Sequence, residues 1–188
     1  LSQQAGNPDF DRDLLKMHAR SLVQSAPAIP ALVLVIAVGG LLAGLATNIA
    51  IWALVTILFY AGLAILAQRA DRTEAPDIDV SATRRNFLIA HLASGIGWAY
   101  FATLGCTDCH VEQLPVIKAV VLLLAIAATA LIASSLRSAM VITFAIPVAV
   151  YAALGAKVWV PIEGLMVGLL IVSLGFFSYV AGQLNKAS

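Results

Sequence analysis

The sequence predicts an all-α polytopic membrane protein with six transmembrane helices and both termini in the cytoplasm. Three observations predict this fold class. The 188 residues are 61% hydrophobic and 11% charged, with a mean hydropathy of +0.96, whereas a soluble domain is about 45–50% apolar and about 25% charged. Six apolar stretches are long enough to cross a bilayer. Basic residues are concentrated in the connections that would face one side of the membrane.

The polar segment 1–28 precedes the first apolar stretch. Asn7, Pro8 and Asp9 form a helix-start signal, which predicts a short amphipathic helix at the cytoplasmic interface of the membrane. A frayed tail is the alternative. In the helical interpretation His18 is a solvated interfacial residue, and the apolar face consists of Phe10, Leu14, Met17 and Ser21.

The six apolar stretches form a predicted transmembrane domain over residues 29–183, and residues 184–188 would begin a linker to a cytoplasmic effector domain. One long polar connection, residues 68–83, carries too many charged side chains to lie in lipid. The spans are expected at residues 30–46, 49–67, 86–105, 115–134, 139–154 and 159–182.

The distribution of basic residues predicts the orientation. Of the 11 Lys and Arg residues, only Lys118 and Lys157 fall on the side away from the termini. Because Lys and Arg are enriched in cytoplasmic loops, both termini are expected in the cytoplasm of a bacterium, with the helices in its inner membrane. The formal net charge of +1 gives no reason to expect a nucleic acid partner.

The densest set of reactive side chains is Cys106-Thr107-Asp108-Cys109-His110, at the extracytoplasmic end of the third predicted span. The string matches the attachment pattern of c-type haem, for which Met166 is a candidate sixth ligand. If the helix continues one turn, Cys106, Cys109 and His110 share one face and offer a site for zinc or copper.

Further ligands are available for such a metal site, and other outcomes remain open. Asp108, Glu112 or Glu163 could complete the metal shell. A Cys106–Cys109 disulfide acting as a redox sensor is a third interpretation, because the compartment permits disulfides. A fourth is that the two thiols face the lipid headgroups and bind nothing.

Ionisable and aromatic side chains inside the spans are candidate ligand-sensing groups. Lys118 and Glu163 lie just inside their spans at the outer end, where a charged side chain reaches the interface or pairs with another group. His91 shares a helix stripe with Trp98 and is expected to form a hydrogen bond to a neighbouring helix. We therefore list Glu163, Lys118, Glu112, His91 and Trp98 as candidate sensor residues.

Two short sequence patterns permit close packing between helices. They are Gly40-Leu41-Leu42-Ala43-Gly44 in the first span and Gly164-Leu165-Met166-Val167-Gly168 in the sixth. Small residues four apart let two helix backbones approach closely. They predict a homodimer in the bilayer.

Several stretches together resemble the N-terminal six-helix membrane sensor module of bacterial cyclic-di-GMP signalling proteins with GGDEF or EAL domains, or of sensor histidine kinases. They are Met17-His18-Ala19-Arg20 before Pro27, Arg84-Arg85-Asn86-Phe87, His91, Gly95, Gly97-Trp98-Ala99 and Pro147. The resemblance covers most of the chain. It implies a sensory and anchoring module that acts on a cytoplasmic effector in cis.

The sequence thus predicts a transmembrane sensor that passes an outer-face or intramembrane stimulus to a cyclase, a phosphodiesterase or a histidine kinase. No enzymatic activity is expected from these residues themselves. A haem c or metal-binding electron-transfer protein is the alternative, and a small transporter is the third. Transport is disfavoured by the lack of paired intramembrane charges and of broken helices in the sequence.

Overall fold

The computed structural model describes residues 8–45, 47–105, 114–132, 137–158 and 161–187, and within these ranges all regular structure is helical. A single 3-10 turn, η1, spans Ala75–Asp77. The α-helices are α1 Pro8–Gln24, α2 Ala28–Leu42, α3 Asn48–Arg72, α4 Val80–Thr103, α5 Leu114–Ile132, α6 Arg137–Val158 and α7 Pro161–Ala187.

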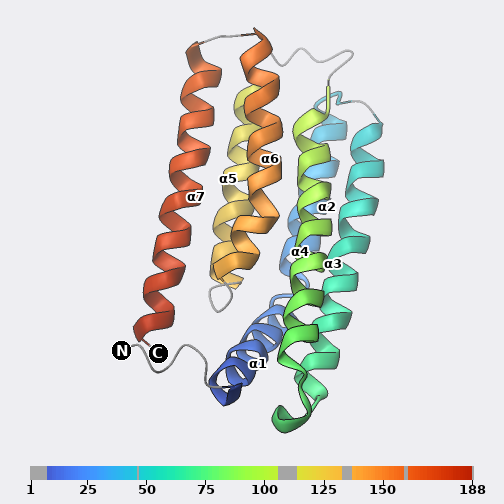
Figure 1. Cartoon of the computed structure of the whole chain (residues 1–188). Coiled ribbons are helices and arrows are strands. Elements are labelled where there is room, and N and C mark those ends of the chain that lie inside the picture. Colours follow the sequence, from blue (N-terminus) through green and yellow to red (C-terminus); the bar gives the residue numbers. More distant parts are fainter. Residues whose placement is uncertain (1–7, 46, 106–113, 133–136, 159–160, 188) are drawn as a thin grey trace.

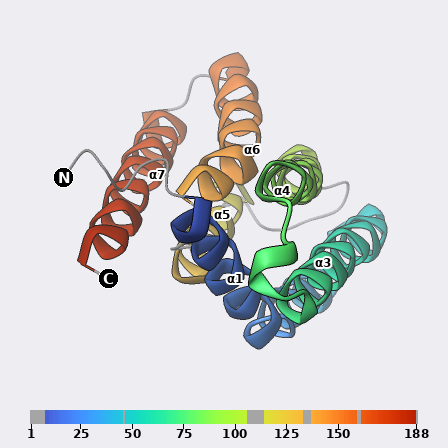
Figure 2. The ribbon, with the colours of Figure 1, turned by 60° about the horizontal axis from the view of Figure 1, so that its bottom comes forward.

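Helices α2 to α7 run side by side and alternate in direction, while α1 lies at one end of this bundle (Figure 1). The C-terminal end of α7 and the connection from α3 to α4 lie at the same end as α1 (Figures 1 and 2). Helix α4 contacts α1, α3, α5 and α6, and its most extensive contact is with α6.

Four of the described helices are long and apolar enough to cross a membrane, namely α3, α5, α6 and α7. Helices α1 and α2, which meet at an angle of 42°, would provide a fifth span if counted as one. Helix α4 is not among the four, because Asn86, His91 and Ser94 lower its hydropathy. These findings confirm an all-helical chain suited to a membrane.

The helix ends differ from the predicted spans for local reasons. Helix α2 stops at Leu42, because Gly44 adopts a φ of 83° and its N–H donates to the carbonyl of Leu41. Helix α3 continues to Arg72, past the predicted end at residue 67. Asp79 begins α4 by accepting a hydrogen bond of 3.0 Å from the backbone N–H of Ala82.

The predicted segment at the N-terminus is a helix, and the face that it buries against the bundle differs from the predicted apolar face. Met17 is 56% exposed, whereas the side chains that α1 buries include Leu15, His18, Ala19 and Leu22. The prediction counted His18 as a solvated polar residue and so rotated the buried face. In the structure α1 packs against α3 and α4, in a cluster that includes Leu63 and Phe87.

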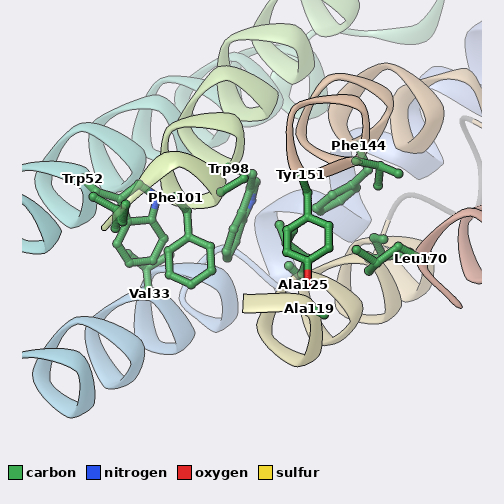
Figure 3. Packing of buried hydrophobic residues seen from close by; sticks show 14 of the residues in the cluster. Val33, Trp52, Trp98, Phe101, Ala119, Ala125, Phe144, Tyr151 and Leu170 are labelled. Atoms are coloured by element: carbon green, nitrogen blue, oxygen red, sulfur yellow. The ribbon is translucent and has the colours of Figure 1, made fainter. Parts of the chain in front are cut away.

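The main hydrophobic core centres on large aromatic side chains near α4 (Figure 3). Trp52 packs on Phe101 with ring centroids 4.8 Å apart and on Trp98 with centroids 5.7 Å apart. Both indole N–H groups are satisfied: Trp52 donates to the carbonyl of Gly97 at 2.8 Å, and Trp98 donates to the hydroxyl of Tyr60 at 3.0 Å. A buried indole therefore contributes apolar area without leaving a donor unpaired.

Glycines allow α4 to approach its neighbours closely. A Cβ atom added to Gly95 would lie 2.5 Å from the carbonyl oxygen of Thr143 in α6. A Cβ on Gly97 would lie 2.8 Å from Oγ1 of Thr56 in α3. Since the first clash is with backbone, α4 and α6 cannot keep their spacing with a larger residue at position 95.

We therefore expect Gly95→Ala to destabilise the bundle by about 1–3 kcal/mol, the usual range for overpacking. Gly62→Ala in α3 is the matched control, because nothing lies within 4 Å of a Cβ at that position. Thermal unfolding of the detergent-solubilised protein measures both. Equal midpoints for the two variants would contradict the close α4–α6 contact.

Candidate functional site

Polar side chains gather at two places in the apolar interior of the described bundle. The inner cluster, His18, His91 and Thr143, joins α1, α4 and α6 near the end where α1 lies. The outer cluster, Lys118, Tyr151 and Glu163, joins α5, α6 and α7 near the opposite end. Helix α4 contributes a residue to the first and a backbone carbonyl to the second.

The inner cluster is a chain of short polar contacts. Nε2 of His18 lies 3.2 Å from Nε2 of His91, and Nδ1 of His91 lies 3.2 Å from Oγ1 of Thr143. The Thr143 hydroxyl donates to the carbonyl of Ala139 at 2.8 Å. His18 and Thr143 are 0% exposed and His91 is 2% exposed, so water does not compete for these contacts.

The geometry assigns the protons of the inner cluster. The Thr143 proton is used on the Ala139 carbonyl, so its oxygen accepts the Nδ1–H of His91. With its single proton on Nδ1, a neutral His91 accepts the Nε2–H of His18 at its own Nε2. Both rings are then neutral, and α1 is bonded to α4 through two imidazoles without burying a charge.

His18 lies on α1, which is not among the four helices that are long and apolar enough to cross a membrane by themselves, and it is buried against aromatic rings. Its ring meets Phe87 edge-on with centroids 5.1 Å apart. Burial, with a smaller contribution from the neighbouring His91, lowers the pKa of His18 from 6.5 to about 3. The folded protein therefore holds His18 neutral at every physiological pH.

The outer cluster combines the buried Tyr151 with the partly buried Lys118 and Glu163. Nζ of Lys118 donates to the carbonyl of Ala102 in the last turn of α4 at 3.1 Å, and the Tyr151 hydroxyl donates to the carbonyl of Pro115 at 2.9 Å. Glu163 lies close enough for its charge to act on both Lys118 and Tyr151. Its Oε2 atom is buried and has no hydrogen-bond partner in the part of the chain that the structure describes.

A pocket of about 230 Å³ adjoins this cluster between α2, α4 and α5. Lys118 is the charged residue among those that line it, and the walls are otherwise apolar, with Phe101, Ile117 and Val121 among them. An ammonium group on an apolar wall favours a small apolar ligand with one acceptor or anionic group. One of the three N–H donors of Lys118 is used on Ala102, which leaves donors for a ligand.

The predicted sensor residues have different outcomes. His91 forms its predicted hydrogen bond to a neighbouring helix. Trp98 is fully buried in the aromatic core and bonds to Tyr60. Lys118 and Glu163 belong to the outer cluster. Met166 packs, partly buried, against the main core.

Apart from Glu163 and Met166, the predicted metal or haem ligands lie outside the described residues. They are Cys106, Asp108, Cys109, His110 and Glu112. Among the residues that the structure does describe, no group of three or more His, Cys, Asp or Glu side chains is placed to hold a metal ion. The predictions of zinc, copper, haem c or a disulfide at this cluster therefore stay predictions.

The prediction of His18 as a solvated residue was wrong, and the roles of Thr143 and Tyr151 were missed. His18 lies one residue beyond Met17 in the chain, on the face that also carries Leu15, Ala19 and Leu22. This spacing of apolar residues around a histidine was the available signal. Nothing in the sequence singles out Thr143, because its importance comes from the approach of α6 to Gly95.

Comparisons with known proteins give no relative for this chain. No protein-family model matches it, and neither a curated protein nor a solved structure matches it significantly. The chemistry of the two clusters and the shape of the bundle therefore carry the functional argument.

The low pKa of His18 predicts that acid weakens the docking of α1. When α1 undocks, the pKa of His18 returns towards 6.5, so the docked state is fully favoured above pH 6.5 and loses stability as the pH falls below it. Between pH 7.5 and pH 5.5 the loss should be about 1 kcal/mol. The undocking of α1 is measured by the rate at which a maleimide labels a Leu22→Cys variant. Leu22 is 7% exposed when α1 is docked, so labelling at this position requires α1 to undock.

His18→Phe is the control for this prediction, because it keeps a ring of similar size and removes the titration. The acid-induced increase in labelling should disappear in that background. An increase of the same size with and without His18 would contradict the assignment.

Proposed function

We propose that the chain is a transmembrane sensory and anchoring module of a bacterial signal-transduction receptor. It lies in the inner membrane with six spans and both ends cytoplasmic, and it passes an outer-face or intramembrane stimulus to a cytoplasmic effector. The effector is a diguanylate cyclase, a phosphodiesterase or a histidine kinase. The single observation that carries this proposal is that α4 bonds to both polar clusters.

Helix α4 is suited to carrying a change from one end of the bundle to the other. Its Ala102 carbonyl accepts the Lys118 ammonium beside the outer pocket, and its His91 holds α1 at the opposite end. The two positions are about 17 Å apart at 1.5 Å per residue. A ligand that binds Lys118 in place of the Ala102 carbonyl removes one contact of α4. Such a ligand binds more tightly to the bundle in which this contact is open, and this difference in affinity shifts the equilibrium towards the open packing.

Helix α7 provides the connection to an effector. Its 27 residues extend about 40 Å, which exceeds the roughly 30 Å of a hydrocarbon core. Only 11% of its apolar window is buried within the bundle. A long helix that is weakly held at the edge can move against the rest of the bundle while remaining continuous into the cytoplasm.

The same exposed face of α7 supports a homodimer in the bilayer. A Cβ on Gly164 or Gly168 would meet nothing within 4 Å, so a second helix can approach there. By contrast, Gly40 lies directly against Ile49 of the same chain, and Gly44 is in the turn that ends α2. We therefore assign the dimer contact to α7 alone.

The proposed orientation predicts the accessibility of the α3–α4 connection. In a background without the two native cysteines, a cysteine placed at residue 75 should resist a membrane-impermeant maleimide in intact cells and react after the cells are opened. A cysteine at residue 105, in a background without the two native cysteines, should react in intact cells. The reverse pattern would place both ends of the chain outside the cytoplasm.

The function itself is tested by fusing the full chain, through α7, to a diguanylate cyclase reporter, whose activity requires two paired catalytic domains. Lys118→Met and Glu163→Gln should each change the cyclic-di-GMP output several-fold, because they alter the outer cluster. Gly164→Leu combined with Gly168→Leu should lower the output by preventing pairing.

The matched control for these variants is Gly62→Leu, on an open face of α3. It should leave the output at the level of the unmodified fusion. If every variant leaves the output unchanged, the module anchors the reporter and senses nothing through these residues.

A further inference from the structure

A groove of about 730 Å³ runs along the outside of the bundle between α4 and α6. Its apolar floor includes Leu88, Ile89 and Leu92 of α4 and Ile142 of α6, and Arg84 and Arg85 stand at one end. The volume falls within the roughly 300–1,000 Å³ of ligand sites in proteins. This groove is separate from both polar clusters, although His91 and Thr143 are the sequence neighbours of Leu92 and Ile142.

The arginines and the apolar residues follow one stripe of α4. From Arg85, the residues Leu88, Ile89 and Leu92 come three, four and seven positions later, which places them on a single helix face. The stripe extends about 10 Å along the helix axis. The groove therefore has a cationic head near the start of α4 and an apolar body that points towards the middle of the bundle.

The two guanidinium groups are available to a ligand. Both Arg84 and Arg85 are exposed. Within the described part of the chain neither forms an ion pair, whereas Arg20 at the same end pairs with Asp71 at 3.6 Å. A guanidinium binds a phosphate through two parallel N–H···O hydrogen bonds, so two adjacent arginines recognise a phosphate group well.

We propose that this groove binds an anionic phospholipid of the cytoplasmic leaflet, with its phosphate on Arg84 and Arg85 and an acyl chain against Leu88, Ile89 and Leu92. This inference rests on the proposed membrane orientation, which puts the start of α4 at the cytoplasmic interface. A soluble phosphate would leave the apolar floor uncovered, and a neutral lipid would leave two cations without a counter-charge. Because Ile142 of α6 also lines the groove, a bound lipid contacts two of the three helices that form the inner cluster.

Lipid retention tests the charge recognition. The full chain, in nanodiscs of phosphatidylcholine with 10% phosphatidylglycerol, is released into the gas phase, and the retained lipids are counted by native mass spectrometry. Phosphatidylglycerol should be enriched over its share of the bilayer. The double variant Arg84→Gln with Arg85→Gln should lower that enrichment about tenfold.

The matched control is Arg69→Gln with Arg72→Gln, which removes the same charge from the last turn of α3 at the same end of the bundle. This control should keep the enrichment. Equal losses in the two double variants would overturn the proposal, because they would indicate general attraction between a basic surface and anionic lipid. Inorganic phosphate should neither displace the lipid nor stabilise the protein, and stabilisation by phosphate alone would indicate a soluble-anion site instead.

A second pair of variants tests the apolar body of the groove. Ile89→Trp fills the groove, and Leu58→Trp adds the same ring on α3, where the native side chain is similarly exposed (59% and 61%). Only the first should reduce retention of phosphatidylglycerol. If both retain it fully, the acyl chain does not occupy the groove and the proposal fails. If the unmodified chain shows no enrichment of phosphatidylglycerol while residue 75 is labelled as expected, this inference alone is overturned, whereas reversed labelling also removes the proposed function.

Discussion

The contact between α4 and α6 is the constraint on which the rest of the structure depends. Gly95 lets the backbone of Thr143 approach to a distance that a Cβ would forbid. That approach brings the Thr143 hydroxyl to His91, which fixes the proton on Nδ1 and leaves Nε2 to receive His18. The docking of α1 on His91 therefore depends on the absence of a Cβ atom one turn further along the same face of α4.

The same constraint explains which helices are apolar. Helix α4 buries His91 and Ser94 against its neighbours, so these polar side chains meet protein rather than lipid, while its exposed face carries apolar side chains such as Ile89 and Ile96. Helix α7 has the opposite environment: few of its residues are buried, and its surface is made of side chains such as Leu165, Val172 and Phe176. In this bundle hydropathy thus measures exposure to lipid more closely than it measures burial in protein.

The sequence was sufficient for features that depend on one helix at a time and insufficient for those that depend on two. The helical chain, its N-terminal helix and the membrane-compatible stretches follow from runs of apolar residues and from start signals such as Asn7-Pro8-Asp9. The buried face of α1 did not follow, because His18 is stabilised by His91, which lies 73 positions away. Likewise, the burial of Glu163 beside Gly155 depends on how α7 packs on α6.

The two ends of α4 differ in how easily their contacts exchange. Lys118 is only partly buried, so water or a ligand can replace the Ala102 carbonyl at a net cost of about 0.5–1.5 kcal/mol for one hydrogen bond. Separating His18 from His91 would leave imidazole nitrogens unsatisfied in an apolar interior, which costs about 1–3 kcal/mol for each group. In the proposed sensor, a stimulus therefore has its least costly entry at the outer cluster. Under the same proposal, the inner cluster opens only after α4 has moved, and that opening is the step that reaches α1.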